Sequence, residues 1–152
     1  MIDRIIEEVK FKYFTWDEIL EPIKIQKITK EQIPMQYIAN IIPTMKCLDM
    51  LREYYGEPIT INSTYRTPQY NSKIGGKSNS LHLVFNAVDW TVKSKSDLKG
   101  LYLTLDLWDK TPNKFYFLPK EKGNLGLGLY PTFVHIDTRS ILQRVSPARW
   151  RE

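Results

Sequence analysis

The spacing of apolar and polar residues changes along this chain, and each change predicts an element of secondary structure. Thr15 and Glu18 form a capping-box pattern, which predicts a short helix as far as about Leu20. Residues 22–34 are expected to be irregular. The main core helix, ending at Gly56, is then predicted by apolar residues at helical spacing, namely Tyr37, Ile38, Ile41, Ile42, Met45, Leu48 and Leu51. Pro43 either kinks this helix or marks its first turn, because proline lacks an N–H donor.

Strand-like patterns dominate the rest of the chain. Residues 58–63 alternate between apolar and polar positions, which favours a strand. Residues 65–77, rich in Pro, Asn, Ser and Gly, are predicted to form an extended surface loop. The remaining elements are predicted as a strand at 87–92, a helix at 97–108 capped by Ser94 or Ser96, and short antiparallel strands at 114–118, 126–130 and 133–137. This order indicates an α+β fold.

Length and composition indicate one folded domain over residues 1–152. The residues are 42% hydrophobic and 12% aromatic, which is enough for a packed core. A chain of 152 residues is too short for two ordinary domains. The apolar runs are shorter than the roughly 20 residues of a membrane span, so we expect no membrane insertion. The charged N-terminus lacks the apolar segment of a signal peptide, which predicts synthesis in the cytoplasm. The single cysteine, Cys47, falls in the helical pattern and is expected to be a buried thiol.

The formal net charge of +5 is compatible with a polyanionic partner, such as nucleic acid, an anionic membrane surface or a cell-wall polymer. The basic residues are spread along the chain, however, and a solvated face explains them equally simply. The sequence contains no helix-turn-helix signature, zinc-finger cysteines or RNA-binding aromatic motif. Nucleic acid is therefore not the expected partner, and the sequence does not define an oligomeric state.

The two histidines of the chain carry its clearest chemical signal. His82 and His135 each lie in an apolar segment close to an aspartate, Asp89 and Asp137 respectively. A catalytic zinc site uses three protein ligands and keeps one position open, where bound water acquires a pKa near 7. His82, Asp89 and His135 would supply this set for one Zn²⁺ per chain, and two histidines with one aspartate favour zinc over manganese or another divalent ion. The alternative is that these are structural histidines beside an ordinary strand-end aspartate.

The ordered context of these residues resembles a known family. The resemblance extends from about residue 14 to 139. The residues that carry it are Ser63 to Pro68, Asn71, Gly75, Gly76, Ser80, His82, Ala87, Asp89, Gly128, Tyr130, His135 and Asp137. They are similar to the zinc D-Ala-D-Ala carboxypeptidase and L-alanyl-D-glutamate endopeptidase family, which includes VanY-like and phage endolysin peptidases. The resemblance implies a fold related to the hedgehog domain, in which helices pack on an antiparallel sheet.

The resemblance also implies roles for individual residues. His82, Asp89 and His135 would be the zinc ligands, and Arg66 would hold a substrate carbonyl or carboxylate and stabilise negative charge. Ser80, Phe85 and Tyr130 would belong to the substrate pocket. Ser80 and Tyr130 would line its wall. Asp137 would act as the general base; alternatively, because it lies two residues beyond His135 on one strand face, it would orient that ligand.

Two positions depart from the family pattern. Phe85 stands where the family has glycine, and a phenylalanine there is expected to narrow or reshape the pocket or to abolish activity. Thr132 stands where some members have an acidic residue three positions before the last ligand, and threonine cannot replace that base. Asn86 is also unusual for this stretch.

The function expected from the resemblance is zinc-dependent hydrolysis of peptide bonds in bacterial peptidoglycan, by a carboxypeptidase or an endopeptidase. The predicted setting is a phage lysin or virion-associated component that reaches the cell wall by lysis or injection. Two alternatives follow from the same sequence. One is a catalytically degenerate member with a structural or wall-binding role, and the other is a basic nucleic-acid-binding module.

Overall fold

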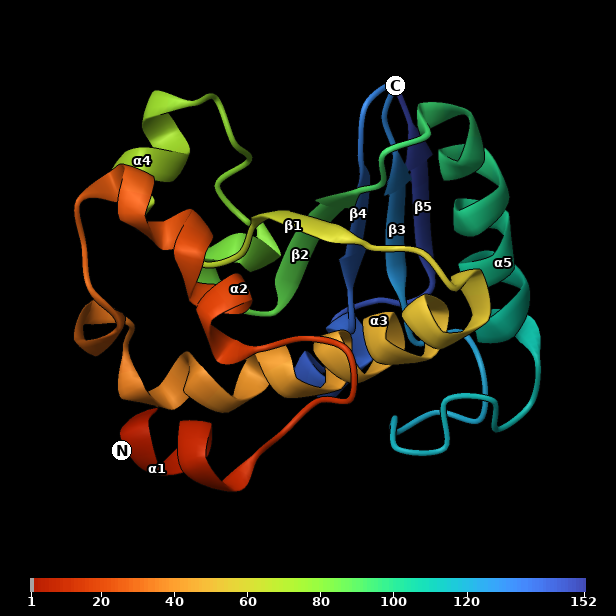
Figure 1. Cartoon of the computed structure of the whole chain (residues 1–152), viewed down its shortest axis with the longest axis horizontal. Coiled ribbons are helices and arrows are strands. Elements are labelled where there is room, and N and C mark those ends of the chain that lie inside the picture. Colours follow the sequence, from red (N-terminus) through yellow and green to blue (C-terminus); the bar gives the residue numbers. More distant parts are fainter. Residues whose placement is uncertain (1) are drawn as a thin grey trace.

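A computed structural model describes residues 2–152 (Figure 1). The α-helices are α1 (Ile2–Glu8), α2 (Trp16–Leu20), α3 (Ile41–Tyr55), α4 (Pro68–Lys73) and α5 (Leu98–Lys110). The strands are β1 (Thr60–Ser63), β2 (Ala87–Thr91), β3 (Gly126–Leu129), β4 (Val134–Asp137) and β5 (Ala148–Arg151). Short 3₁₀ helices occupy many of the connections, namely η1 (Glu21–Gln26), η2 (Lys30–Gln32), η3 (Met35–Asn40), η4 (Leu81–Val84), η5 (Lys95–Asp97) and η6 (Arg139–Leu142). The α+β class predicted from the sequence is confirmed.

The five strands form one sheet in the order β1-β2-β4-β3-β5. All neighbours are antiparallel except β3 and β5, which are parallel. Side chains alternate between the two faces of a strand, so alternate residues of β2 and β4 are divided between them. One face carries fully buried apolar residues, namely Val88, Trp90, Leu127, Val134 and Ile136. The opposite face carries the candidate chemistry.

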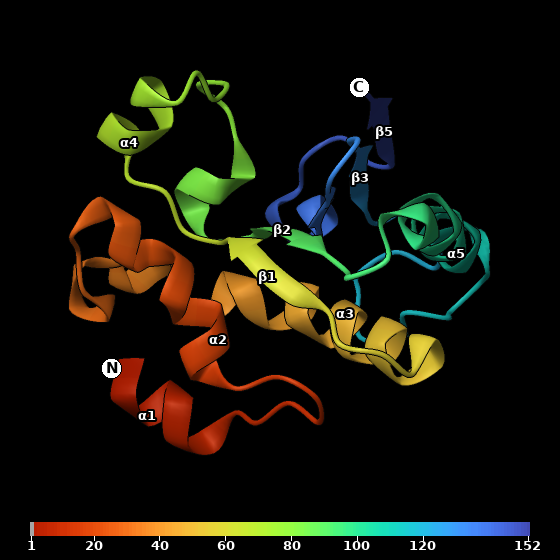
Figure 2. The ribbon, with the colours of Figure 1, turned by 45° about the horizontal axis from the view of Figure 1, so that its top comes forward.

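Helices α3 and α5 cover the apolar face. Figures 1 and 2 show α3 running beneath β1 and β2, with α5 beside β3, and both helices contribute buried residues to the core. Helix α3 begins with Pro43 in its first turn, where no intrahelical bond to the missing N–H is required. It ends at Gly56, whose φ of 78° is left-handed. Both features agree with the sequence pattern, and the kink considered for Pro43 is not needed.

Several local predictions are confirmed. Thr15 and Glu18 form the complete capping box at α2, and Cys47 is fully buried in α3. No helix within residues 2–152 combines the length and apolar composition needed to cross a membrane.

Other local predictions are wrong. The stretch 65–77 contains helix α4, which begins at Pro68 after Thr67 accepts a hydrogen bond from Tyr70 N. The expected strand at 114–118 is a series of turns packed at the end of α5. Neither Ser94 nor Ser96 caps α5, because the 3₁₀ helix η5 leads directly into it. Strand β5 and helix α1 were not predicted.

Phe85, which stands where the family pattern has glycine, is accommodated by burial of its side chain. It follows η4 in the left-handed region, with φ 57° and ψ 42°, the conformation that glycine adopts most readily. Its ring is fully buried in the core and meets Tyr65 edge to face, with ring centroids 6.2 Å apart. The cost of the left-handed backbone is therefore offset by burial of a large apolar side chain.

The two effects at Phe85 can be separated by paired substitutions. Phe85→Ala should lower the free energy of unfolding by about 3–5 kcal/mol, because a buried ring is lost. Phe85→Gly should be about 1 kcal/mol more stable than Phe85→Ala, because glycine relieves the left-handed strain. Urea denaturation measures both values.

The control pair is Leu48→Ala and Leu48→Gly, at a buried position within α3. There the order should reverse, with glycine about 1 kcal/mol less stable than alanine. An alanine variant at position 85 as stable as the glycine variant would contradict backbone strain at Phe85.

Candidate metal centre

The register of the sheet brings the strand-borne site residues into one row. Asp89 on β2 lies opposite His135 on β4, His135 lies opposite Gly128 on β3, and Gly128 lies opposite Trp150 on β5. All four therefore share the face of the sheet that is turned away from α3 and α5. A side chain at Gly128 would collide with the indole of Trp150, so glycine is required for that ring to lie over the row.

His82 reaches this row from the 3₁₀ helix η4. The hydroxyl of Ser80 caps η4 by accepting a hydrogen bond from His82 N at 3.3 Å. The backbone N–H of Arg66 donates to His82 O at 3.0 Å, and the His82 ring nitrogen Nδ1 lies 2.6 Å from Thr64 O. The chain that follows β1 thus holds both the backbone and the ring of His82.

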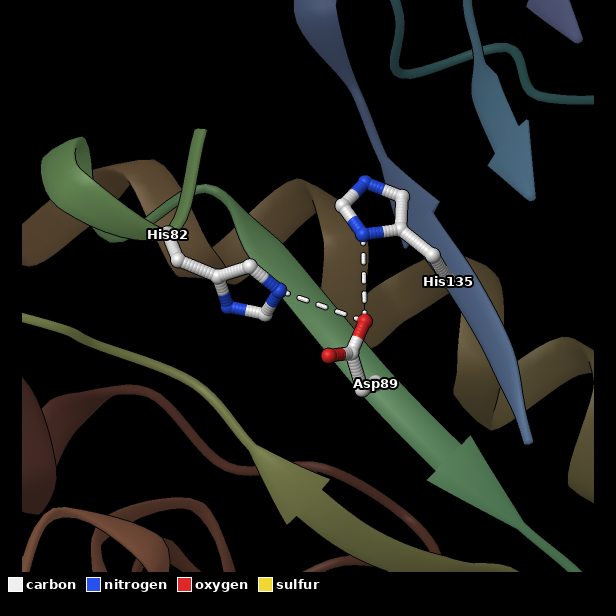
Figure 3. A group of neighbouring side chains, drawn as sticks. All are labelled: His82, Asp89 and His135. Atoms are coloured by element: carbon white, nitrogen blue, oxygen red, sulfur yellow. Dashed lines mark hydrogen bonds and ion pairs between the residues drawn. The ribbon is translucent and has the colours of Figure 1, made fainter. Parts of the chain in front are cut away.

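The three predicted ligands converge (Figure 3). Asp89 Oδ1 lies 3.2 Å from His82 Nε2 and 3.1 Å from His135 Nδ1. One ligand atom from each residue can be chosen so that all lie within 4.8 Å of one another. All three residues are buried. The pairing of β2 with β4 brings Asp89 beside His135, and η4 brings His82 to the same point, although the three residues are far apart in the sequence.

The hydrogen bonds of His82 favour a metal cation between these atoms. Thr64 O can only accept, so Nδ1 of His82 carries the proton and Nε2 presents a lone pair. Burial lowers the pKa of His82, which favours this neutral ring. Nε2 is buried, makes no hydrogen bond within the described chain, and faces the carboxylate of Asp89. Two facing acceptors attract a cation, so the residues present fit a divalent metal with nitrogen and oxygen ligands.

Asp137 contacts the His135 ring on the side opposite to Asp89. Its Oδ2 lies 2.7 Å from His135 Nε2, so this nitrogen donates to Asp137 while Nδ1 faces Asp89. Arg139 donates two side-chain hydrogen bonds to the same carboxylate, each of 2.9 Å, and Gly126 N donates a third bond from the backbone. The carboxylate of Asp137 is completely buried and is directed at the second ring nitrogen of His135.

The charged groups shift one another's ionisation. Burial acts to lower the pKa of His135, but hydrogen bonds to Asp137 and Asp89 outweigh it and raise this pKa to about 9 in the metal-free protein. Burial acts to raise the pKa of Asp89 and Asp137. The imidazoles beside both carboxylates, and Arg139 beside Asp137, nevertheless hold these two pKa values well below the usual range. Both carboxylates are therefore ionised at neutral pH.

Arg66 lies beside the candidate ligands. Its Nη2 is 3.2 Å from Asp89 Oδ2, and its other nitrogens donate to Ser63 Oγ and Asn71 Oδ1, each at 3.3 Å. Asn71 is buried and donates in turn to Lys77 O at 2.9 Å. Helix α4 therefore fixes the guanidinium through Asn71.

A pocket of about 510 Å³ surrounds these groups. Arg66, Ser80 and Tyr130 line it together with the three candidate ligands and Asp137, so the structure brings these predicted site residues together. Phe85 does not line it, because its ring points into the core. The expected narrowing of the pocket by Phe85 is therefore not what the structure has.

Some residues at the site had no role assigned from the sequence. Thr64 lies in the matching motif, but it acts through its carbonyl oxygen, which leaves no side-chain signal. Trp150 lies over His135, with ring centroids 5.0 Å apart, and its place there depends on strand β5, which the sequence pattern did not predict. Asn71 and Gly76 belonged to the matching motif, but their roles required the fold: a side chain at Gly76 would collide with Asn71.

Comparison with known proteins agrees with this geometry. A 52-residue stretch of the chain is 42% identical to the zinc D-Ala-D-Ala carboxypeptidase of Streptomyces albus G, and covers 34% of this chain and 20% of that relative. The alignment thus spans a small part of the relative's length. The family model described as Peptidase M15 matches residues 12–137, a stretch that contains all three candidate ligands. The resemblance read from the sequence is confirmed, and the chain belongs to the M15 peptidase family.

Proposed function

We propose that this protein is a zinc-dependent peptidase that cleaves peptides of bacterial peptidoglycan. The observation that carries the proposal is the buried, unpartnered Nε2 of His82, which faces Asp89 Oδ1 beside His135. A structural histidine would have a hydrogen-bond partner on this nitrogen. His82, Asp89 and His135 are accordingly the proposed ligands of one Zn²⁺, which when bound acts as a Lewis acid and supplies a nucleophilic water at neutral pH.

The surrounding residues of the chain would bind and orient the substrate. Arg66 is held by Ser63, Asn71 and Asp89, so its guanidinium can donate hydrogen bonds to a substrate carbonyl or carboxylate without reordering. Ser80 and Tyr130 present hydroxyl groups at the pocket wall. These groups would fix the scissile bond beside the metal ligands.

The charge of the pocket favours an acidic peptide. Lys77 and Arg144 line it, and within residues 2–152 neither forms an ion pair with a carboxylate of the chain. Stem peptides of peptidoglycan carry free carboxylates, which these cations would attract. The similar protein from Streptomyces albus G is a D-Ala-D-Ala carboxypeptidase, which supports the same class of substrate. A phage lysin or virion-associated hydrolase is the proposed setting.

The role proposed for Asp137 is to orient His135. The carboxylate accepts from His135 Nε2 and from Arg139, whereas the candidate metal-binding nitrogen of His135 is Nδ1, on the opposite side of the ring. Such a partner fixes the tautomer of a metal-binding histidine and raises its basicity. This arrangement favours the orienting role over the general-base role considered from the sequence.

Metal content and cleavage together test the function. We expect about one zinc per chain by mass spectrometry, and chelator-sensitive release of products from a D-Ala-D-Ala peptide or from purified peptidoglycan. His82→Ala should lose both zinc and turnover, because it removes one of three ligands. Product masses identify the bond that is cut. Zinc binding without cleavage of either substrate would support the degenerate, wall-binding alternative.

Asp137→Asn separates the orienting role from the base role. Loss of the charge should weaken zinc affinity by about 10–100-fold, and saturating zinc should restore most of the turnover. The affinity is measured by competition with a chromophoric chelator.

The matched control is Asp109→Asn. Asp109 is equally buried and also accepts from an arginine, Arg149, but it lies on α5, away from the pocket. This variant should lose stability and keep its zinc affinity. A fully zinc-loaded Asp137→Asn protein without turnover would instead identify Asp137 as the base.

A further inference from the structure

Strand β5 brings a hydrogen-bonded pair of aromatic residues to the metal pocket. Trp150 lies outside the family match, which ends at residue 137, yet it lines the same pocket as His82, Asp89 and His135. Its indole Nε1 donates a hydrogen bond of 2.9 Å to the hydroxyl of Tyr130. The parallel pairing of β5 with β3 fixes Trp150, because the strand register places it opposite Gly128.

The ring of Tyr130 is held from several directions. It stacks on Phe133 with centroids 4.2 Å apart and planes 9° from parallel. The backbone N–H of Tyr130 donates to Phe133 O at 3.0 Å, which closes the turn between β3 and β4. The hydroxyl is therefore presented to the pocket with little freedom, as a preorganised group must be.

The direction of the Trp150 bond determines what the hydroxyl of Tyr130 can do. An indole N–H can only donate, so the phenol oxygen accepts from Trp150 and its own hydrogen remains free to donate. The structure contains no acceptor within hydrogen-bond distance of this hydroxyl among residues 2–152. The charges of Asp89 and Arg66 both act on the pKa of Tyr130, for which burial is the largest cause of the upward shift. The phenol thus stays protonated at neutral pH and lies within electrostatic reach of the candidate centre.

We infer that Tyr130 is a catalytic residue that donates a hydrogen bond to the scissile carbonyl oxygen as negative charge develops there, and that Trp150 is the positioning residue for this hydroxyl. The inference rests on the proposed peptidase function. It assigns Tyr130 a hydrogen-bond donor role in addition to that of pocket lining. Donation from Trp150 also polarises the phenol and strengthens the bond that Tyr130 donates.

The test compares Tyr130→Phe and Trp150→Phe with the wild type, all zinc-loaded. Tyr130→Phe should lower kcat by about 100-fold, the effect of losing one such donor, with little change in KM. Trp150→Phe keeps an aromatic ring and should lower kcat in the same direction by a smaller factor. Zinc content should be unchanged in both. The matched control is Tyr116→Phe, at an exposed tyrosine that does not line the pocket.

A second readout is independent of activity. In zinc-free protein labelled with ¹³C at the tyrosine ring, the Tyr130 signal is assigned by its absence from Tyr130→Phe and is titrated with base. Trp150→Phe should raise the pKa of Tyr130, because the bond from the indole stabilises the phenolate. An unchanged pKa would overturn the positioning role of Trp150.

The outcomes distinguish this inference from the proposed function. A wild-type protein that binds zinc but cleaves neither substrate would contradict the function itself. An active wild type with Tyr130→Phe at wild-type kcat would overturn the inference alone. A fall in kcat accompanied by loss of zinc would also overturn it, because the pair would then only support the metal ligands.

Discussion

The antiparallel pairing of β2 with β4 sets both faces of the sheet at once. With Asp89 opposite His135, the neighbouring pair Val88 and Ile136 points into the core beneath. A slip of one residue would turn His135 into the apolar core and expose Ile136. The hydrophobic effect that buries the apolar pairs therefore also fixes the positions of the candidate ligands. The geometry of the site depends on packing that takes no part in its chemistry.

The polar groups on the site face are held by donors and acceptors from outside the ligand set. Thr64 O fixes the tautomer of His82, and Asp137 fixes that of His135. The carboxylate of Asp137 is itself neutralised by Arg139. Because a buried charge without a partner is costly, this chain of contacts keeps the ligand atoms turned toward a common point. Membership of the M15 peptidase family is consistent with a metal ion at that point.

Phe85 and Asn86 show how a departure from a family pattern can be structural. Phe85 adopts a left-handed backbone conformation, which glycine adopts most readily, and adds a buried ring to the core. Asn86 is also fully buried, and its amide bonds to Asn40 O and to the hydroxyl of Thr138. These contacts join the start of α3 to the segment after β4. Both substitutions stabilise the frame around η4, and neither side chain enters the pocket.

The sequence by itself determined the α+β class, the core helix α3, the capping box of α2, the strands that carry Asp89 and His135, and the family. These follow from local periodicity, capping and motif order, which are written in neighbouring residues. Tertiary structure alone decided that Asp137 contacts the far nitrogen of His135, that Phe85 points inward, and that Trp150 returns to the pocket. Those facts depend on ring orientation, on a backbone carbonyl such as Thr64 O, and on the pairing of β5 with β3, for which residues distant in sequence must first be packed together.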